Sequence, residues 1–135
     1  MRRELALPGY DVQYLETTGL EWETIADGPG AGGWLLLNNW PIKTHGYNVD
    51  RVLIALRIQP GYPETQIDMV YFHPALSRCD NKAIGALSTQ QIDGMTFQRW
   101  SRHRTPESPW RPEVDEIVTH LVLVDDWLAR EFEKT

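Results

Sequence analysis

The sequence predicts a single α+β domain in which an antiparallel meander of strands packs against a C-terminal helix. Its length of 135 residues suits one domain. Short apolar runs separated by Gly and Pro fill most of the chain, and a helical apolar pattern fills its end. We divide the domain, residues 1–135, into an N-terminal extension with strands at 1–33, a meander at 34–74, an irregular segment at 75–109 and a helix at 110–133.

The strands are predicted from branched and aromatic runs that end at turn residues. Residues 22–26 alternate in polarity, the glycine-rich segment 27–33 forms a turn, and the apolar run 34–37 completes a hairpin. Residues 51–58 form a buried strand rich in branched side chains, and residues 66–72 form another that ends at a His-Pro pair. Together these strands make up the meander.

The glycine-rich segment also fits the GxGxxG pattern of dinucleotide-binding loops at residues 28–33. That chemistry requires a helix directly after the loop, so that the helix N–H groups face the pyrophosphate. Residues 34–41 are too short and too strand-like to form such a helix. We therefore interpret the segment as a hairpin turn and expect no cofactor.

The strongest helical pattern lies near the C-terminus. Pro112 is expected at the start, where a missing N–H costs nothing, and the acidic side chains after it complement the positive end of the helix dipole. We expect the apolar stripe to cover one face of the sheet. Its members are Val114, Ile117, Val118, Leu121, Val124, Leu128 and Phe132.

Composition excludes several classes of function. The net charge of −6 disfavours a nucleic-acid or anionic-membrane partner, since either needs a basic face. No segment has the length and apolarity of a membrane span or a secretory signal, so we expect a cytoplasmic protein. The single cysteine, Cys79, excludes an internal disulfide, and the four histidines lack metal-binding spacing, so no metal is expected.

A basic segment with a tryptophan, residues 98–104, stands out in this acidic chain. If the segment is extended, Ser101 and His103 point to the same face, and His103 can take the proton of the serine hydroxyl. On a helix the two side chains diverge. The alternatives are a solvated basic loop and an RNA-binding patch, and the net charge argues against the second.

Cys79 is the other candidate nucleophile. Arg78 and Lys82 lie on either side of it in the chain, and basic neighbours favour the thiolate form. The alternative is an exposed cysteine without a chemical role.

Several short motifs follow one another in a recognisable order. A Gly-Tyr-Pro turn at 61–63 precedes a strand, His-Pro-Ala follows at 73–75, and Trp-Arg-Pro at 110–112 opens the helix. This order resembles that of the ubiquitin-conjugating enzymes. Through residues 48–54 and 96–103 the chain more closely resembles the bacterial E2-like proteins of prokaryotic family E, which are encoded beside a ubiquitin-like protein and an activating enzyme.

The resemblance covers residues 34–132 and implies the fold of a ubiquitin-conjugating enzyme. The chain departs from that family at three points. The usual N-terminal helix is not found in residues 1–33, and Ala75 replaces the asparagine that helps to position the acyl carbonyl. No cysteine stands just before Trp110, where the family has its nucleophile.

The resemblance further implies an E2-like carrier in a bacterial conjugation pathway of a kind linked to phage defence. Its partners are an E1-like activating enzyme, a ubiquitin-like protein and a protein target. Ser101 lies on the side of the Trp-Arg-Pro motif where the family's nucleophile sits, so we expect it to accept the C-terminal glycine of the ubiquitin-like protein as an oxyester. His103 would act as base and then as acid, while Arg99 and Arg102 would hold the carboxyl end or the oxyanion. Two alternatives stay open: a non-catalytic adaptor that binds both partners, and a thioester carrier that uses Cys79.

Overall fold

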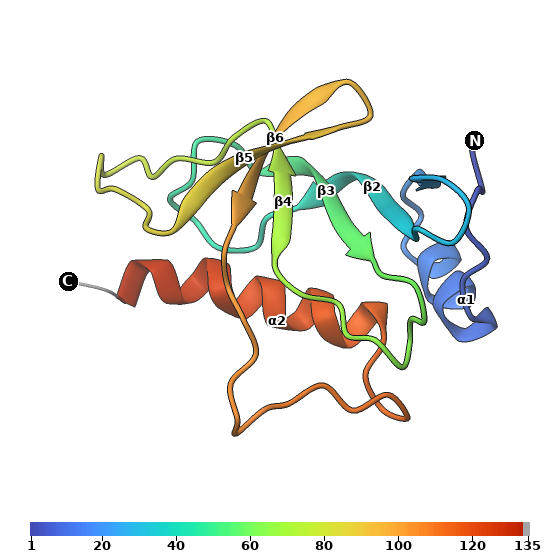
Figure 1. Ribbon diagram of the computed structural model, residues 1–135. Helices are drawn as coiled ribbons and strands as arrows, with labels where there is room; N and C mark the ends of the chain where they lie inside the picture. Colours follow the sequence, from blue (N-terminus) through green and yellow to red (C-terminus); the bar gives the residue numbers. More distant parts are fainter. Residues whose placement is uncertain (134–135) are drawn as a thin grey trace.

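The computed structural model describes residues 1–133 and confirms the α+β class. Its strands form one antiparallel sheet in the order β1-β2-β3-β4-β6-β5, with helices on one face (Figure 1). No helix in this part of the chain has the length and apolarity to cross a bilayer. The strands are β1 (Trp22–Ala26), β2 (Gly33–Pro41), β3 (Arg51–Ile58), β4 (Val70–His73), β5 (Leu87–Ile92) and β6 (Met95–Trp100). The helices are α1 (Gly9–Thr17), α2 (Ile117–Arg130) and a 3₁₀ turn (Glu131–Glu133).

The main core lies between the sheet and the two α-helices. The α2 stripe recurs at helical spacing, and its buried members pack on the inner residues of the central strands. Leu37 and Ile54 are fully buried in this core. The turn at 27–32 joins β1 to β2, so the predicted hairpin is confirmed and no helix follows the glycines. The buried members of the stripe are Ile117, Leu121, Val124 and Leu128.

Two predicted boundaries were wrong. The helix begins at Ile117 rather than Pro112, and Val114 is 57% exposed instead of belonging to the stripe. A capping box sets this start, since the Glu116 N–H donates to the Thr119 hydroxyl. The strand expected at 66–72 begins only at Val70, because the preceding residue has a positive φ of 58° that no regular strand adopts.

The expectation that the N-terminal helix is missing was also wrong, because α1 occupies that place. Only Asp11 and Leu15 of this helix are buried, so the sequence shows no apolar stripe that would reveal it. Pro8 and Gly9 at its start are typical of a turn. In the structure Pro8 instead occupies the N-cap, before the first helical N–H groups.

The segment at 75–109 was expected to be irregular, but it contains the β5–β6 hairpin. Asp93 and Gly94 join the two strands with φ values of 53° and 77°, as a type I′ turn requires. The far end of the hairpin folds over the outer face of the sheet and forms a second, smaller core. This outer core consists of Ile25, Trp34, Leu36, Ala55, Tyr71, Ile92 and Phe97.

Arg2 connects the hairpin to the opposite end of the sheet. Its Nη2 lies 2.8 Å from a carboxylate oxygen of Glu23 on β1 and 2.6 Å from one of Asp93 in the β5–β6 turn. Because β1 and β5 stand at opposite ends of the strand order, this contact shows that the hairpin curls across the outer face.

Asp11 links α1, the 61–63 turn and the start of α2. It is 1% exposed, and its carboxylate accepts hydrogen bonds from the Tyr62 hydroxyl at 2.6 Å and from the Ile117 N–H at 3.1 Å. We expect Asp11→Ala to lower the free energy of unfolding by about 2 kcal/mol, because the half-buried Tyr62 hydroxyl and the buried Ile117 N–H lose a charged acceptor. Urea denaturation measures this. The exposed Asp50→Ala serves as the control, and equal stabilities of the two variants would contradict the prediction.

Candidate functional site

Ser101 follows β6 directly and lies at the centre of a tight turn. Its N–H donates to the Ala86 carbonyl at 3.1 Å, and the Arg102 N–H donates to the Trp100 carbonyl at 3.0 Å, as in a γ-turn. The Ser101 hydroxyl makes no hydrogen bond within residues 1–133, and it is not among their buried unpaired atoms. Backbone contacts therefore fix this half-buried residue, while its Oγ is unbonded and not fully buried.

The side chain of Arg102 is fixed by contacts with other parts of the protein. Its Nη2 lies 3.0 Å from the Glu131 carboxylate, Nη1 donates to the Gly85 carbonyl at 3.1 Å, and the guanidinium lies over the Trp100 ring. The Arg102 side chain is 13% exposed and that of Glu131 is 2% exposed. These contacts anchor the turn at Ser101 and leave Arg102 little freedom to hold a substrate carboxylate.

Arg99 is placed differently from Arg102. It lies on β6 opposite Tyr71 of β4 and Ser88 of β5. Side chains alternate along a strand, so Arg99 faces the same side of β6 as Ser101 would in a continued strand. Among residues 1–133 its side chain makes neither a hydrogen bond nor an ion pair, and its Nε is buried without a partner. Of the two arginines, Arg99 has the guanidinium that is not committed.

His103 pairs with Asp68 rather than with Ser101. Its Nδ1 lies 3.1 Å from one carboxylate oxygen of Asp68 and 3.0 Å from the other. The His103 side chain is 62% exposed and that of Asp68 is 32% exposed. Nε2 has no hydrogen-bond partner in the described part of the chain. The role of His103 as a base for Ser101 therefore stays a prediction.

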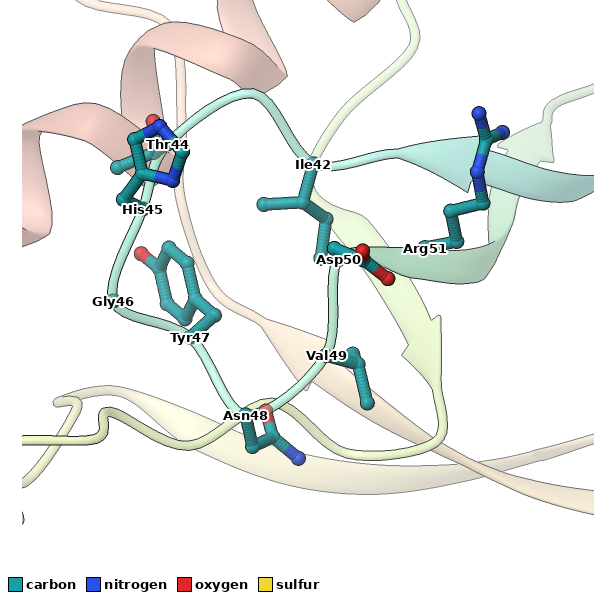
Figure 2. A pocket seen from close by; sticks show the side chains of 9 residues that line it. All are labelled: Ile42, Thr44, His45, Gly46, Tyr47, Asn48, Val49, Asp50 and Arg51. Atoms are coloured by element: carbon teal, nitrogen blue, oxygen red, sulfur yellow. The ribbon is translucent and has the colours of Figure 1, made fainter.

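Cys79 lies in the loop after β4 and is exposed. Its N–H donates to the Gly46 carbonyl at 2.7 Å, and its thiol donates to the Tyr47 carbonyl at 3.3 Å. These bonds tie it to the loop between β2 and β3. That loop surrounds a cavity of about 600 Å³, which Figure 2 shows with its lining residues, Ile42 and 44–51.

The neighbours of Ser101 and Cys79 meet at the C-terminal end of α2. Arg78 donates from Nη1 to the Glu131 carbonyl at 2.6 Å, and Arg102 reaches the carboxylate of the same residue. The β5–β6 hairpin separates the two candidate nucleophiles in the chain. In space, both therefore lie near one end of α2.

The sequence analysis missed three residues that shape this region: Asp68, Glu131 and Asn48. The Asn48 amide donates to the Ala75 carbonyl at 3.1 Å, and its side-chain oxygen accepts the Ser77 N–H at 2.9 Å. It thereby fixes the loop that follows the His-Pro pair. No sequence signal relates these residues to the site, because each reaches its partner across a distant part of the chain.

One comparison with known families finds a match over most of the chain. The model of prokaryotic E2 family E matches residues 7–131, a range that includes the sheet, both α-helices and every candidate residue above. No curated protein and no solved structure matches the chain. The chain therefore belongs to prokaryotic E2 family E, and its role is an E2-like one in a conjugation pathway.

Proposed function

We propose that the protein is an E2-like carrier that holds a ubiquitin-like protein on Ser101. The Ser101 oxygen attacks the carbonyl carbon of the C-terminal glycine, which an activating enzyme presents as a thioester. A C–O bond forms, the C–S bond breaks, and the hydroxyl proton passes to the departing thiolate. The product is an oxyester, which then transfers its acyl group to an amine of a protein target.

The observation that carries this proposal is the presentation of the Ser101 hydroxyl. The residues on both sides are fixed, since Trp100 is fully buried and Arg102 is paired with Glu131. The hydroxyl between them is unbonded and not fully buried. A nucleophile held in this way loses little freedom when it meets a carbonyl, which favours its attack.

Arg99 supports the proposal as a group for binding the acyl end. Its guanidinium has no ion-pair partner among residues 1–133, and it lies near the end of β6, two residues before the serine. A positive group beside the reacting carbonyl stabilises the negative charge that develops on its oxygen. We therefore assign oxyanion stabilisation to Arg99 and an anchoring role to Arg102.

Cys79 is a second candidate acceptor, and its exposure favours it. Its loop directly follows the His-Pro pair, and bonds to Gly46 and Tyr47 hold it in place. A carrier that uses this thiol would form a thioester, which differs from an oxyester in its chemical lability. One experiment therefore separates the two acceptors.

The test is the intact mass of the protein after incubation with its activating enzyme, the ubiquitin-like protein and ATP. We expect an adduct that resists dithiothreitol, is cleaved by mild base, and falls below detection in Ser101→Ala. Ser108→Ala, an exposed serine of the same loop, is the control and should load normally.

Other outcomes would contradict the proposal in distinct ways. An adduct cleaved by dithiothreitol and lost in Cys79→Ala would assign the acceptor to the thiol. Conjugation that needs the protein but proceeds in both variants, without any adduct, would make the protein an adaptor.

A further inference from the structure

The structure pairs His103 with Asp68, two residues that lie far apart in the chain and that the carrier step does not use. We propose that this pair is the proton acceptor for the incoming amine, with His103 as the base and Asp68 as its positioning residue. This inference rests on the proposed function, because the amine attacks the acyl group that the carrier holds.

The pairing fixes which ring nitrogen of His103 is basic. A carboxylate accepts a hydrogen bond and has none to donate, so Nδ1 carries the proton that both Asp68 oxygens approach. The lone pair then lies on Nε2, which makes no hydrogen bond among residues 1–133. The negative carboxylate also stabilises the imidazolium that forms when Nε2 accepts a proton.

The contacts and exposure of His103 favour an amine over the serine as the proton donor. The Ser101 hydroxyl makes no hydrogen bond to His103, although only one residue separates them in the chain. The histidine is 62% exposed and lines a cavity of about 490 Å³ between its own loop and α2. A lysine side chain that approaches from solvent can therefore reach the imidazole without passing through the protein.

The other charged side chains around His103 form ion pairs with one another. Arg104 lies 3.8 Å from Asp115, in the loop before α2, and Arg130 lies 2.7 Å from Asp126, on α2. All four of these residues line the same cavity as the histidine. The carboxylate of Asp68 is thus the charge that contacts the imidazole directly.

The transfer step balances with these groups and solvent water. The amine nitrogen attacks the acyl carbon, and one N–H proton moves to Nε2 of His103. A C–N bond forms, the bond to the carrier oxygen breaks, and that oxygen takes a proton from water while the imidazolium releases its proton to the solvent. The histidine ends in its starting form, and the products are an amide and a free Ser101 hydroxyl.

The experiment separates loading from discharge. The protein is first loaded with the ubiquitin-like protein, the activating enzyme is then quenched, and free lysine is added as the amine. The single-turnover loss of the adduct is followed by intact mass at fixed pH. Loading is measured separately, as the rate at which the adduct appears.

We expect His103→Gln to slow discharge by about 100-fold, the usual contribution of a general base, and to slow loading much less. Asp68→Asn should slow discharge by about tenfold, because the neutral amide places no negative charge beside the imidazolium. Asp68→Glu should restore part of the rate. His45→Gln, an exposed histidine of another loop, is the control.

Two results would overturn the inference while the carrier role stands. In the first, both variants load and discharge at the wild-type rate. In the second, loading falls as much as discharge, which would make His103 the base for the acceptor hydroxyl. A wild-type protein that never forms an adduct would overturn the carrier and the base together. Because the assay follows the loss of an acyl group, it applies equally to an adduct on Cys79.

Discussion

Trp100→Ala is expected to lower the free energy of unfolding by about 4 kcal/mol, as truncation of a buried tryptophan usually does. Trp100 is 0% exposed, and its ring packs edge-on against Phe72 at a centroid distance of 5.5 Å. Its Nε1 donates to the Gln98 side chain at 2.9 Å. The sheet and α2 enclose the ring, so little of the cavity would close after truncation. Urea denaturation followed by far-UV circular dichroism measures the loss.

The same substitution should also disturb the acceptor. The Trp100 ring lies under the guanidinium of Arg102, whose contacts hold the turn at Ser101. We therefore expect slower loading even under conditions where the variant is folded. Trp100→Phe keeps an aromatic ring at this position and serves as the control, with a smaller loss of stability. A loss below about 1 kcal/mol for the alanine variant, the size of an ordinary substitution, would show that the ring is not a major part of the core.

Acid is expected to destabilise the protein through His120. This side chain is 0% exposed, and its Nε2 donates to the Met69 carbonyl at 2.9 Å. Nδ1 is buried without a partner among residues 1–133, so a second ring proton would find no acceptor there. Burial is the main cause that lowers the pKa of His120 from 6.5 to about 4, and the positive charge of Arg104 adds to it.

The direction of the pH effect follows from proton binding. Between pH 6.5 and about 4 the unfolded chain binds a proton at this histidine that the folded chain does not bind. The stability contribution is therefore complete above pH 6.5 and is lost as the pH falls toward 4. The shift corresponds to a loss of about 3 kcal/mol in the free energy of unfolding.

The measurement compares the wild type with His120→Gln, in urea denaturation at a series of pH values. The variant is expected to be less stable near neutral pH but to lose about 3 kcal/mol less on acidification. His45→Gln, at an exposed position, should follow the wild type. Parallel curves for the wild type and His120→Gln would contradict the prediction.

The elements that were predicted correctly are those whose buried residues recur at a regular spacing in the sequence. The spacing of Ile117, Leu121, Val124 and Leu128 identifies α2, because each packs on the same side. The helix α1, which was not predicted, has no such regular spacing of apolar residues. Leu15 is the one apolar side chain that α1 buries completely, so that helix depends on tertiary contacts such as the Asp11 bonds.

The β5–β6 hairpin shows a different kind of failure. Its strands are rich in Ser, Thr and Gln, because only part of the hairpin packs on the outer core. The Asp93-Gly94 pair is the strongest short-range hairpin signal in this segment, and it lies between apolar residues at 92 and 95. The polar composition of the two strands was the reason that the hairpin was not predicted, although its Asp-Gly turn residues specify one.

The candidate site was predictable only as far as local sequence extends. Ser101 and His103 stand close together in the chain, so the sequence alone singles out both as candidates. Asp68 reaches His103 only because β4 pairs with β6, and Arg102 proves to be an anchor only because α2 ends beside it. The charge of a side chain can be read from the sequence, but its partner cannot.

The hairpin over the outer core also restricts how another protein can approach this chain. Trp34, Leu36 and Tyr71 would offer a broad apolar platform if they were open, yet each is at most 7% exposed beneath it. A protein that binds this apolar surface would first have to displace Ile92 and Phe97. It would also have to break the ion pair between Arg2 and Asp93 in the turn. Binding partners can therefore reach the helices, the loops and the edges of the sheet. The hairpin blocks their access to the outer face of the central strands.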